Sequence, residues 1–186
     1  MNIEFREKFC RYYIVDNLLP QDVLKTAIEY SIANIPNMSK GTVGAYGVSL
    51  LAPAHKNNLN LWLEHDSVLH NIIETYINKL PLESLIPSKG RSLLSAYYND
   101  GHYSWHKDTA KGMTFNYMFT SEPTAFSGGA FVLGSKDNIK YTDAVPFRNN
   151  RMIIFPADVW HSVEKVTIEN DSPQNFRYSL QYWTAE

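Results

Sequence analysis

The stretch Gly101 to Asp108 (GHYSWHKD) places a histidine and an aspartate two residues apart, in a chain of 186 residues that has six histidines. In an extended strand successive side chains alternate between two faces, so His106 and Asp108 are expected to point the same way. An imidazole beside a carboxylate forms either a salt bridge or part of a metal site. A third ligand from elsewhere in the chain would decide between these interpretations.

The third ligand that we expect is His161, which follows an apolar run and a Pro-Ala-Asp turn. Two imidazoles and one carboxylate on one side of a metal form the facial triad typical of non-haem Fe(II) oxygenases, which leaves other coordination positions open. His102 shares the expected face of His106, but it would lie about 13 Å away along an extended strand, too far to bind the same ion. The sequence therefore predicts a metal site made by His106, Asp108 and His161.

Two later segments have polar faces that could hold a co-substrate at this metal. In residues 176–183 (FRYSLQYW), alternation puts Arg177 and Ser179 on one face, where a guanidinium fork and a hydroxyl can bind a carboxylate together. An arginine that points into a protein interior costs free energy unless an anion meets it. In residues 113–120 (MTFNYMFT), the polar face that includes Asn116 is expected to line the same cavity.

Strands in the second half of the chain must position these residues. From Ser92 onward the hydrophobic pattern alternates, and turn residues separate the segments. The expected strands are 92–98, 103–108, 113–120, 129–133, 141–146, 151–156, 160–166 and 176–183. Eight short strands of this kind indicate a sandwich or barrel of the jelly-roll type, over residues of about 91–186.

The first half, residues 1 to about 90, has mainly helical patterns. The expected elements are an edge strand at 11–15, a helix at 20–34, a loop or short strand with three glycines at 40–52, and a helical region at 59–80 with Asp66 as N-cap. We expect these helices to pack on one outer face of the sheet, because antiparallel sheets commonly cover one face and leave the other for solvent or ligand. The fold class predicted is mainly β with flanking α.

Composition limits the kind of protein. The length suits a single domain, 1–186, with 44% apolar and 19% charged residues. The net charge of −2, without runs of like charge, indicates neither a nucleic acid nor an anionic membrane as partner, so a small molecule or a peptide is the expected substrate. Cys10 is the only cysteine and the N-terminal residues form neither a secretory signal nor a membrane span, so we expect a cytoplasmic protein.

The ordered set of motifs from 92 to 183 resembles the Fe(II)/2-oxoglutarate-dependent dioxygenases, in particular their prolyl-4-hydroxylase-like branch. The resemblance rests on Tyr98 and Gly101 before the metal motif, His106-x-Asp108, the strand 113–120, Gly128-Gly129, Phe155-Pro156-x-Asp158, His161, and Arg177-x-Ser179 with Trp183 six residues after the arginine. Two features depart from the family pattern. Arg177 follows His161 by sixteen residues, more than is usual, and the segment before His106 is short.

The resemblance implies a role for each matching residue. His106, Asp108 and His161 would be the iron ligands. Arg177, helped by Tyr98 or Ser179, would bind the distal carboxylate of 2-oxoglutarate. Asn116 would lie near that co-substrate, and Trp183 would form part of the cavity wall. Tyr97 and Tyr98 remain alternatives. The fold implied is the double-stranded β-helix, and the cofactors are Fe(II), 2-oxoglutarate and O2.

The activity implied is hydroxylation of an aliphatic C–H bond, and the presence of Asp108 favours hydroxylation over halogenation. The substrate could be a prolyl peptide or protein, a free amino acid or a small natural product. Residues 40–52 would then be a lid, a hypothesis that changing Tyr46 could test. Two alternatives remain: a cupin-like metalloenzyme that does not use 2-oxoglutarate, and a non-catalytic jelly-roll binding module. The sequence does not indicate an oligomeric state.

Overall fold

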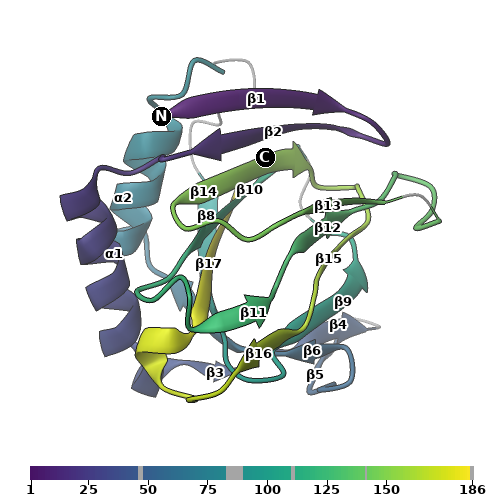
Figure 1. Cartoon of the computed structure of the whole chain (residues 1–186). Helices are drawn as coiled ribbons and strands as arrows, with labels where there is room; N and C mark the ends of the chain where they lie inside the picture. The colour runs from purple at the N-terminus through teal and green to yellow at the C-terminus, as the bar shows by residue number, and fades with distance from the viewer. Residues whose placement is uncertain (46–47, 83–89, 110–111, 141, 185–186) are drawn as a thin grey trace.

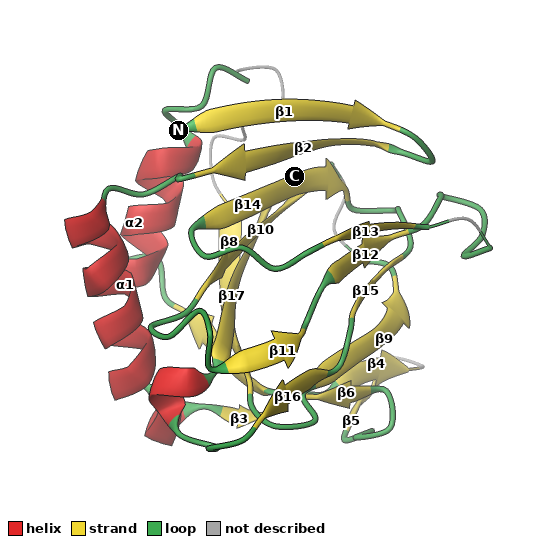
Figure 2. Ribbon diagram, viewed as in Figure 1, coloured by secondary structure: helices red, strands yellow, loops and turns green. Residues whose placement is uncertain are grey.

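The computed structural model describes residues 1–45, 48–82, 90–109, 112–140 and 142–184. Antiparallel strands dominate it, and the largest sheet has eight of them (Figures 1 and 2). In spatial order they are β1 (Asn2–Glu7), β2 (Arg11–Asp16), β14 (Arg151–Pro156), β10 (Met113–Phe119), β17 (Arg177–Thr184), β8 (Gly90–Tyr97), β7 (Leu59–Leu63) and β3 (Ser39–Lys40). The longest of these strands lie at the centre, where β17 pairs with both β10 and β8.

A five-stranded sheet lies opposite the large one (Figure 1). Its order is β13 (Asp143–Val145), β12 (Phe131–Leu133), β15 (His161–Val163), β9 (His102–His106) and β6 (Lys56–Asn57). Two further pairs are β11 (Phe126–Gly128) with β16 (Val166–Ile168), and β4 (Val43–Ala45) with β5 (Val48–Leu50). The molecule is thus mostly β with a jelly-roll arrangement, as the alternating second half of the sequence predicts.

Two α-helices, α1 (Gln21–Ala33) and α2 (Val68–Ile77), run side by side at one flank of the large sheet (Figure 2). Side chains tie α2 to the sheet: His70 Nδ1 lies 2.7 Å from the Ser92 hydroxyl of β8, and the Tyr182 hydroxyl of β17 donates to Glu74 at 2.9 Å. Short 3-10 turns occur at Ile35–Asn37 and Pro173–Asn175. Within the described chain, neither α1 nor α2 combines the length and apolar character needed to cross a membrane.

The sequence predicts a helical region over 59–80, and the first part of this prediction is wrong. Leu59–Leu63 forms β7, which pairs with β8, and the helix begins only at Val68. The apolar residues of LNLWL alternate with a period of two, which five residues cannot clearly separate from a helical pattern. The N-cap is also Ser67 and not Asp66, because the Ser67 hydroxyl accepts a hydrogen bond from the His70 amide.

The mainly helical character predicted for residues 1–90 is likewise wrong, since the described part of this half contains β1 to β7 beside α1, α2 and one short 3-10 turn. Most of these strands have two to five residues, too few to show an alternating pattern. Residues 11–15 do form a strand, but β1 covers it, so β2 is not an edge. The segment 40–52 contains the β4–β5 pair, and Tyr46, the residue whose change would test the lid hypothesis, lies outside the described residues.

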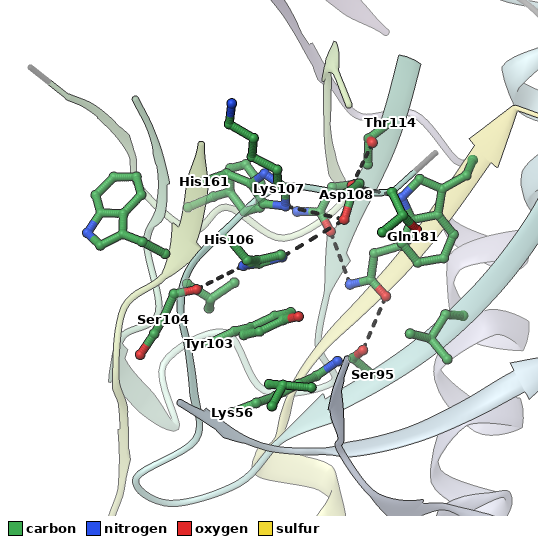
Figure 3. Close-up of a pocket in the computed structure, with 18 of the residues that line it drawn as sticks. Lys56, Ser95, Tyr103, Ser104, His106, Lys107, Asp108, Thr114, His161 and Gln181 are labelled. Carbon is green, nitrogen blue, oxygen red and sulfur yellow. Dashed lines mark hydrogen bonds and ion pairs between the residues drawn. The ribbon is translucent and has the colours of Figure 1, made fainter. Parts of the chain in front are cut away.

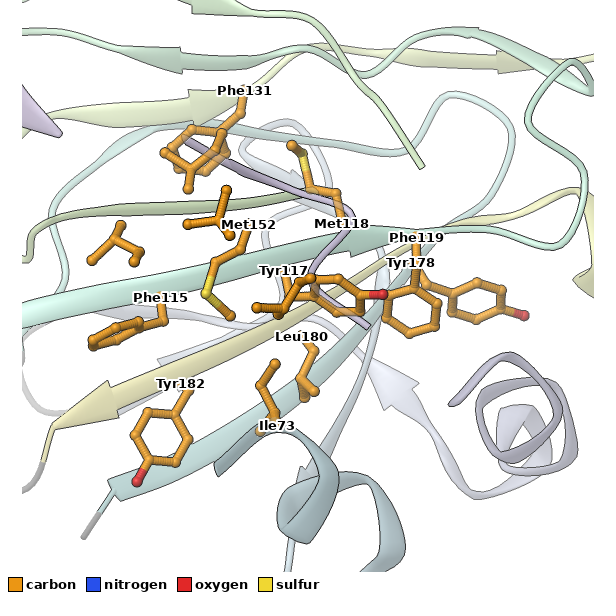
Figure 4. Packing of buried hydrophobic residues seen from close by; sticks show 14 of the residues in the cluster. Ile73, Phe115, Tyr117, Met118, Phe119, Phe131, Met152, Tyr178, Leu180 and Tyr182 are labelled. Atoms are coloured by element: carbon orange, nitrogen blue, oxygen red, sulfur yellow. The ribbon is translucent and has the colours of Figure 1, made fainter. Parts of the chain in front are cut away.

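The core explains why one face of β10 and β17 is free for the cavity. Phe115 and Phe119 of β10 pack against Tyr182 and Tyr178 of β17, with ring centroids 6.1 and 5.6 Å apart (Figure 4). All four rings are buried on the side of α2, whose Ile73 lies beside them. Alternation therefore turns the intervening side chains toward the five-stranded sheet.

A buried ion pair joins β2 to β14. Arg151 donates to both carboxylate oxygens of Asp16, with distances of 2.6 and 3.0 Å, and Asp16 is only 9% exposed. The Arg151 guanidinium lowers the pKa of Asp16 below its usual range. A lowered pKa in the folded state stabilises the protein above the unfolded pKa of about 3.9, and this contribution is lost as the pH falls through the folded pKa.

We therefore expect Asp16→Asn to lower the free energy of unfolding by about 2 kcal/mol at pH 7, because the largely buried Arg151 and the more exposed Arg148 both lose their carboxylate partner. The difference from the unchanged protein should shrink as the pH falls from about 4 through the lowered pKa of folded Asp16, because the wild-type carboxylate is then neutralised as well. Urea unfolding of both proteins at pH 7 and below pH 4 measures this difference in the free energy of unfolding. A difference that stays the same at both would show that the charge of Asp16 contributes nothing.

Candidate active site

Strand pairing brings the two predicted histidine ligands together. β9 and β15 are antiparallel neighbours, with His106 directly opposite His161 and their ring centroids 4.1 Å apart. Asp108 lies two residues beyond the end of β9, and not within a strand as expected, but its amide donates to the Ala157 carbonyl at 3.0 Å and fixes the turn. The ligand atoms of the three residues all lie within 4.8 Å of one another (Figure 3).

Backbone carbonyls determine which imidazole nitrogen faces the site. His106 Nδ1 lies 2.8 Å from the Ser104 carbonyl, and His161 Nδ1 lies 2.9 Å from the Val159 carbonyl. Because a carbonyl only accepts, each Nδ1 carries the proton and each Nε2 keeps its lone pair. The two Nε2 atoms lie 3.9 and 3.7 Å from the same oxygen, Oδ1 of Asp108.

The second oxygen of Asp108 is already bound. Oδ2 accepts hydrogen bonds from the Thr114 hydroxyl of β10 at 2.7 Å and from the Trp183 indole of β17 at 2.8 Å. The carboxylate is therefore held so that Oδ1 alone faces the histidines. Thr114 shares the polar face of 113–120 that the sequence predicts to line the cavity, and Trp183 has a predicted wall position. The sequence contains no signal that both would hold Asp108.

Burial keeps both imidazoles neutral. It lowers the pKa of His106 to about 2, with a further contribution from His161, and it lowers the pKa of His161 against the opposing effect of Asp108. Tyr103 stacks on the His106 ring at 3.5 Å between centroids, and Phe155 meets the His161 ring edge-on at 4.8 Å. Neutral imidazoles are the form that binds a metal, so this donor set suits a divalent cation.

Arg177 is a buried cation without an anion. It is fully buried, and its Nε donates to the Gly129 carbonyl at 2.9 Å. Its two terminal nitrogens, Nη1 and Nη2, have no hydrogen-bond partner in the described part of the chain. Burial lowers its pKa to about 10, so it is still charged at neutral pH. A group with two charge-assisted donors left open suits a carboxylate ligand.

The glycine that contacts Arg177 occupies a position that strongly favours glycine. Gly129 has φ of +69°, and a Cβ built there would lie 2.8 Å from Arg177 Cδ. A side chain at this position would be strained by the left-handed conformation and by the close approach together. The sequence indicated only a turn or bulge for Gly128-Gly129, so its contact with the arginine is a new feature.

Ser179, Asn116 and Gln181 form a hydrogen-bonded group between Arg177 and the metal site. The Ser179 hydroxyl donates to Asn116 Oδ1 at 2.8 Å, and Gln181 Nε2 donates to Asn116 Oδ1 at 3.3 Å and to the Ser179 oxygen. Asn116 and Gln181 line the cavity, whereas Ser179 lies beneath them. The Asn116 amide nitrogen is buried without a partner in the described residues, which leaves one more donor for a ligand.

The structure places Tyr97, not Tyr98, at the cavity. Tyr97 is fully buried, lines the cavity and lies 4.9 Å from the Arg177 guanidinium. The Tyr98 hydroxyl instead contacts Asn57 and accepts from Lys40 at 3.2 Å, and Tyr98 is not among the lining residues that the structure describes. Of the two alternatives, the cavity lining therefore favours Tyr97, and a contact of either tyrosine with 2-oxoglutarate stays a prediction. Two successive tyrosines face opposite ways, and only the register of Tyr97 opposite Arg177 decides which one points inward.

The cavity around these groups has a volume of about 920 Å³. At its rim, the ring centroids of the half-exposed Trp62 and of Trp183 lie 5.7 Å apart. The Arg91 guanidinium carbon lies 4.7 Å from the centre of the Trp62 ring and covers it. Lys56 lies within the wall, although the sequence gave no signal for it: it belongs to the two-residue strand β6 and is 8% exposed. Burial lowers the pKa of Lys56 to about 8.

Comparison with known proteins agrees with this geometry. The model of the 2OG-Fe(II) oxygenase superfamily matches residues 93–185, which is half of the chain. A PKHD-type hydroxylase from the bacterium Prochlorococcus marinus is 28% identical over 169 residues, which cover 83% of this chain and 72% of the relative.

Solved structures share the fold. A prolyl-4-hydroxylase from Pseudomonas putida has a TM-score of 0.70 at 13% identity, covering 94% of this chain and 92% of its own. A prolyl hydroxylase from Trichoplax adhaerens, in complex with a hypoxia inducible factor oxygen degradation domain peptide fragment, has a TM-score of 0.67 at 16% identity, covering 92% and 82%. The metalloenzyme without 2-oxoglutarate and the non-catalytic module are therefore set aside. The chain belongs to the 2OG-Fe(II) oxygenase superfamily and is a hydroxylase that uses Fe(II), 2-oxoglutarate and O2.

Proposed function

We propose that this enzyme hydroxylates an aliphatic C–H bond at an iron held by His106, Asp108 and His161. One observation carries the assignment: three ligand atoms converge within 4.8 Å while every other polar atom of the three side chains is already hydrogen-bonded. Such a set leaves the remaining coordination positions of a metal open for co-substrate and O2.

Arg177 is our candidate for the distal carboxylate of 2-oxoglutarate. Its support is the pair of Nη atoms on a fully buried guanidinium that lack a partner among the described residues. Tyr97 lines the cavity and its ring centre lies 4.9 Å from the Arg177 guanidinium, so we propose it in place of Tyr98 as the aromatic contact. Ser179 donates to Asn116, whose amide nitrogen would serve as a further donor.

When bound, the iron couples oxidative decarboxylation of 2-oxoglutarate by O2 to hydroxylation of the substrate. The protein's own side chains position the reactants and exclude water. Thr114 and Trp183 orient Asp108, and the Ser104 and Val159 carbonyls hold the imidazoles with Nε2 inward. Tyr103 and Phe155 cover the histidine rings and keep solvent from them.

For the substrate we propose a proline, free or within a peptide, with other amino acids and small natural products as further candidates. The support is indirect: two of the structures that share the fold are prolyl hydroxylases, and one of them holds a peptide. A cavity of about 920 Å³ is large enough for 2-oxoglutarate together with one residue of a peptide.

Anaerobic titration with Fe(II) and then with 2-oxoglutarate tests the proposal. The chelated complex should give a weak visible charge-transfer band. His106→Ala should abolish this band. In Arg177→Ala the band should form only at a much higher concentration of 2-oxoglutarate. Iron binding without any band in the unchanged protein would refute this site for 2-oxoglutarate.

The Trp183 indole is expected to position Asp108, so Trp183→Phe should weaken iron binding about tenfold. Loss of a hydrogen bond to a metal ligand typically costs 10- to 100-fold in metal affinity, and phenylalanine keeps most of the packing against Trp62. Titration with Fe(II) under argon measures the affinity. Trp160→Phe is the matched control, since Trp160 carries Lys107 on its ring and is outside the described cavity lining. Equal affinities for both variants would contradict a positioning role.

We also propose that residues 1–186 act as one oxygenase domain in a cytoplasmic compartment. Strands from both halves share the eight-stranded sheet, and a reducing compartment keeps both Cys10 and the iron reduced. A single cooperative unfolding transition, followed by both fluorescence and circular dichroism, is expected; two separate transitions would contradict one domain.

A further inference from the structure

Lys56 is a second buried cation for which the protein supplies no anion. None of the ion pairs within the described residues includes it. Its ammonium lies 4.3 Å from the centre of the Tyr103 ring, and the Asn60 amide presents its oxygen at 3.1 Å in the orientation that satisfies both amide atoms. Both neighbours are neutral. The Asp108 carboxylate acts on the charge of Lys56 from across the cavity, but it forms no ion pair with the ammonium, so the charge is only weakly compensated.

Strand pairing and hydrogen bonds fix the position of Lys56. β6 pairs with β9, which sets Lys56 opposite Tyr103. Asn60 in turn donates to the Ser95 hydroxyl at 2.8 Å, and Ser95 donates to Gln181 at 3.1 Å, so a chain of neutral hydrogen bonds links the lysine to β17. Figure 3 shows the ammonium end beside Ser95, on the opposite side of Tyr103 from His106.

When iron and 2-oxoglutarate are bound, the positive charge of Lys56 has no negative charge to balance it. With the proposed ligands, a ferrous ion, the Asp108 carboxylate, the 2-oxoglutarate dianion and the Arg177 guanidinium already sum to zero. An additional buried ammonium is unfavourable unless another anion approaches. Among the described residues that line the cavity, Lys56, Arg91 and Lys107 are cationic and Asp108 is the only carboxylate, so the cavity favours an anionic guest.

The distance from the metal site suits a small molecule. The Tyr103 ring touches Lys56 on one face and the His106 ring on the other, with separations of 4.3 and 3.5 Å. One aromatic ring thus separates the ammonium from the His106 imidazole. A molecule of amino-acid size can place a C–H group near the iron and a carboxylate on Lys56 at the same time.

We propose that Lys56 binds a carboxylate of the substrate, so that the enzyme selects an amino acid or a peptide segment with a carboxylate next to the hydroxylated residue. This inference rests on the proposed function, because it assigns the other buried cation, Arg177, to 2-oxoglutarate. The same chemistry could serve the co-substrate instead, and the experiment distinguishes these two sources of carboxylate.

The test uses Lys56→Met, which keeps the aliphatic stem and removes the charge, with Lys56→Arg as the conservative variant. Lys25→Gln removes one positive charge from the exposed face of α1 and is the matched control. Each protein, loaded with Fe(II) and 2-oxoglutarate without O2, is titrated with three pairs of probes: L-proline and L-prolinamide, N-acetyl-L-proline and its amide, and prolyl peptides with glutamate or glutamine beside the proline. The shift of the visible band reports binding.

In the wild type, at least one carboxylate probe should bind about tenfold or more tightly than its neutral partner, the ratio expected for a charge-assisted contact. Lys56→Met should lose this preference while its affinity for 2-oxoglutarate changes less than about twofold, and Lys56→Arg should retain part of it. The control should match the wild type throughout.

Three results would overturn the inference. In the first, the wild type binds no carboxylate probe more tightly than its neutral partner; in the second, Lys56→Met keeps the preference. In the third, Lys56→Met loses much of its 2-oxoglutarate affinity, which would assign the lysine to the co-substrate. Failure of the proposed function looks different, because then no band forms in the wild type and both proposals fall.

Discussion

Replacing Asp108 by alanine is expected to abolish iron binding and hydroxylation while the fold persists. Asp108 is the only carboxylate of the three-residue site, and its Oδ1 faces both Nε2 atoms. Loss of a neighbouring hydrogen bond alone typically costs 10- to 100-fold in metal affinity, so loss of a charged ligand should exceed about a hundredfold. Iron titration monitored by equilibrium dialysis and 2-oxoglutarate turnover measure both effects.

Asp158→Asn is the matched control for this change. Asp158 is half-exposed, pairs with Lys136 at 2.7 Å and lies only three residues from His161, yet it is not part of the described cavity lining. It should bind iron like the wild type. Urea unfolding of Asp108→Ala should remain cooperative, because Thr114 and Trp183 lose one acceptor but keep their packing. Iron affinity within a few-fold of the wild type would contradict the assignment of Asp108 as a ligand.

The sequence predicted the parts of the fold that have long, regular patterns. The strands β10, β14 and β17 have six to eight residues with apolar side chains packed against a well-defined core, and their positions are confirmed. The helix α1 is confirmed as well, within one residue of its expected limits. Short elements such as β6 and β7 could not be predicted, because their pairing partners β9 and β8 lie far along the chain and determine their conformation.

The candidate site shows the same division. His106, Asp108 and His161 could be chosen from residue type and order, and the structure brings them together. Which tyrosine faces Arg177 depends on the register between β8 and β17, which a single sequence does not contain. The hydrogen bonds of Thr114 and Trp183 to Asp108 and the burial of Lys56 likewise arise from contacts between distant segments. The sequence therefore indicates which side chains can bind a metal or a carboxylate. It does not indicate which residues from distant segments contact them.

Replacing Arg177 by methionine is expected to weaken 2-oxoglutarate binding about a hundredfold and to leave iron affinity unchanged. Loss of a two-pronged charge-assisted contact corresponds to about 3 kcal/mol. The fold should tolerate the change, since the guanidinium is buried with two unpaired nitrogens in the described structure and methionine fills a similar volume. Titration of the visible band with 2-oxoglutarate gives the affinity, and urea unfolding gives the stability.

The exposed Arg11→Met, at a position outside the described cavity lining, is the control. Together with Lys56→Met, these variants separate the two buried cations. If Arg177 binds the co-substrate and Lys56 the substrate, each variant weakens one ligand and spares the other. Unchanged 2-oxoglutarate affinity in Arg177→Met would refute its role. Loss in Lys56→Met instead would mean that the lysine, one aromatic ring from His106, binds the co-substrate while the arginine stabilises the Gly129 turn through its Nε.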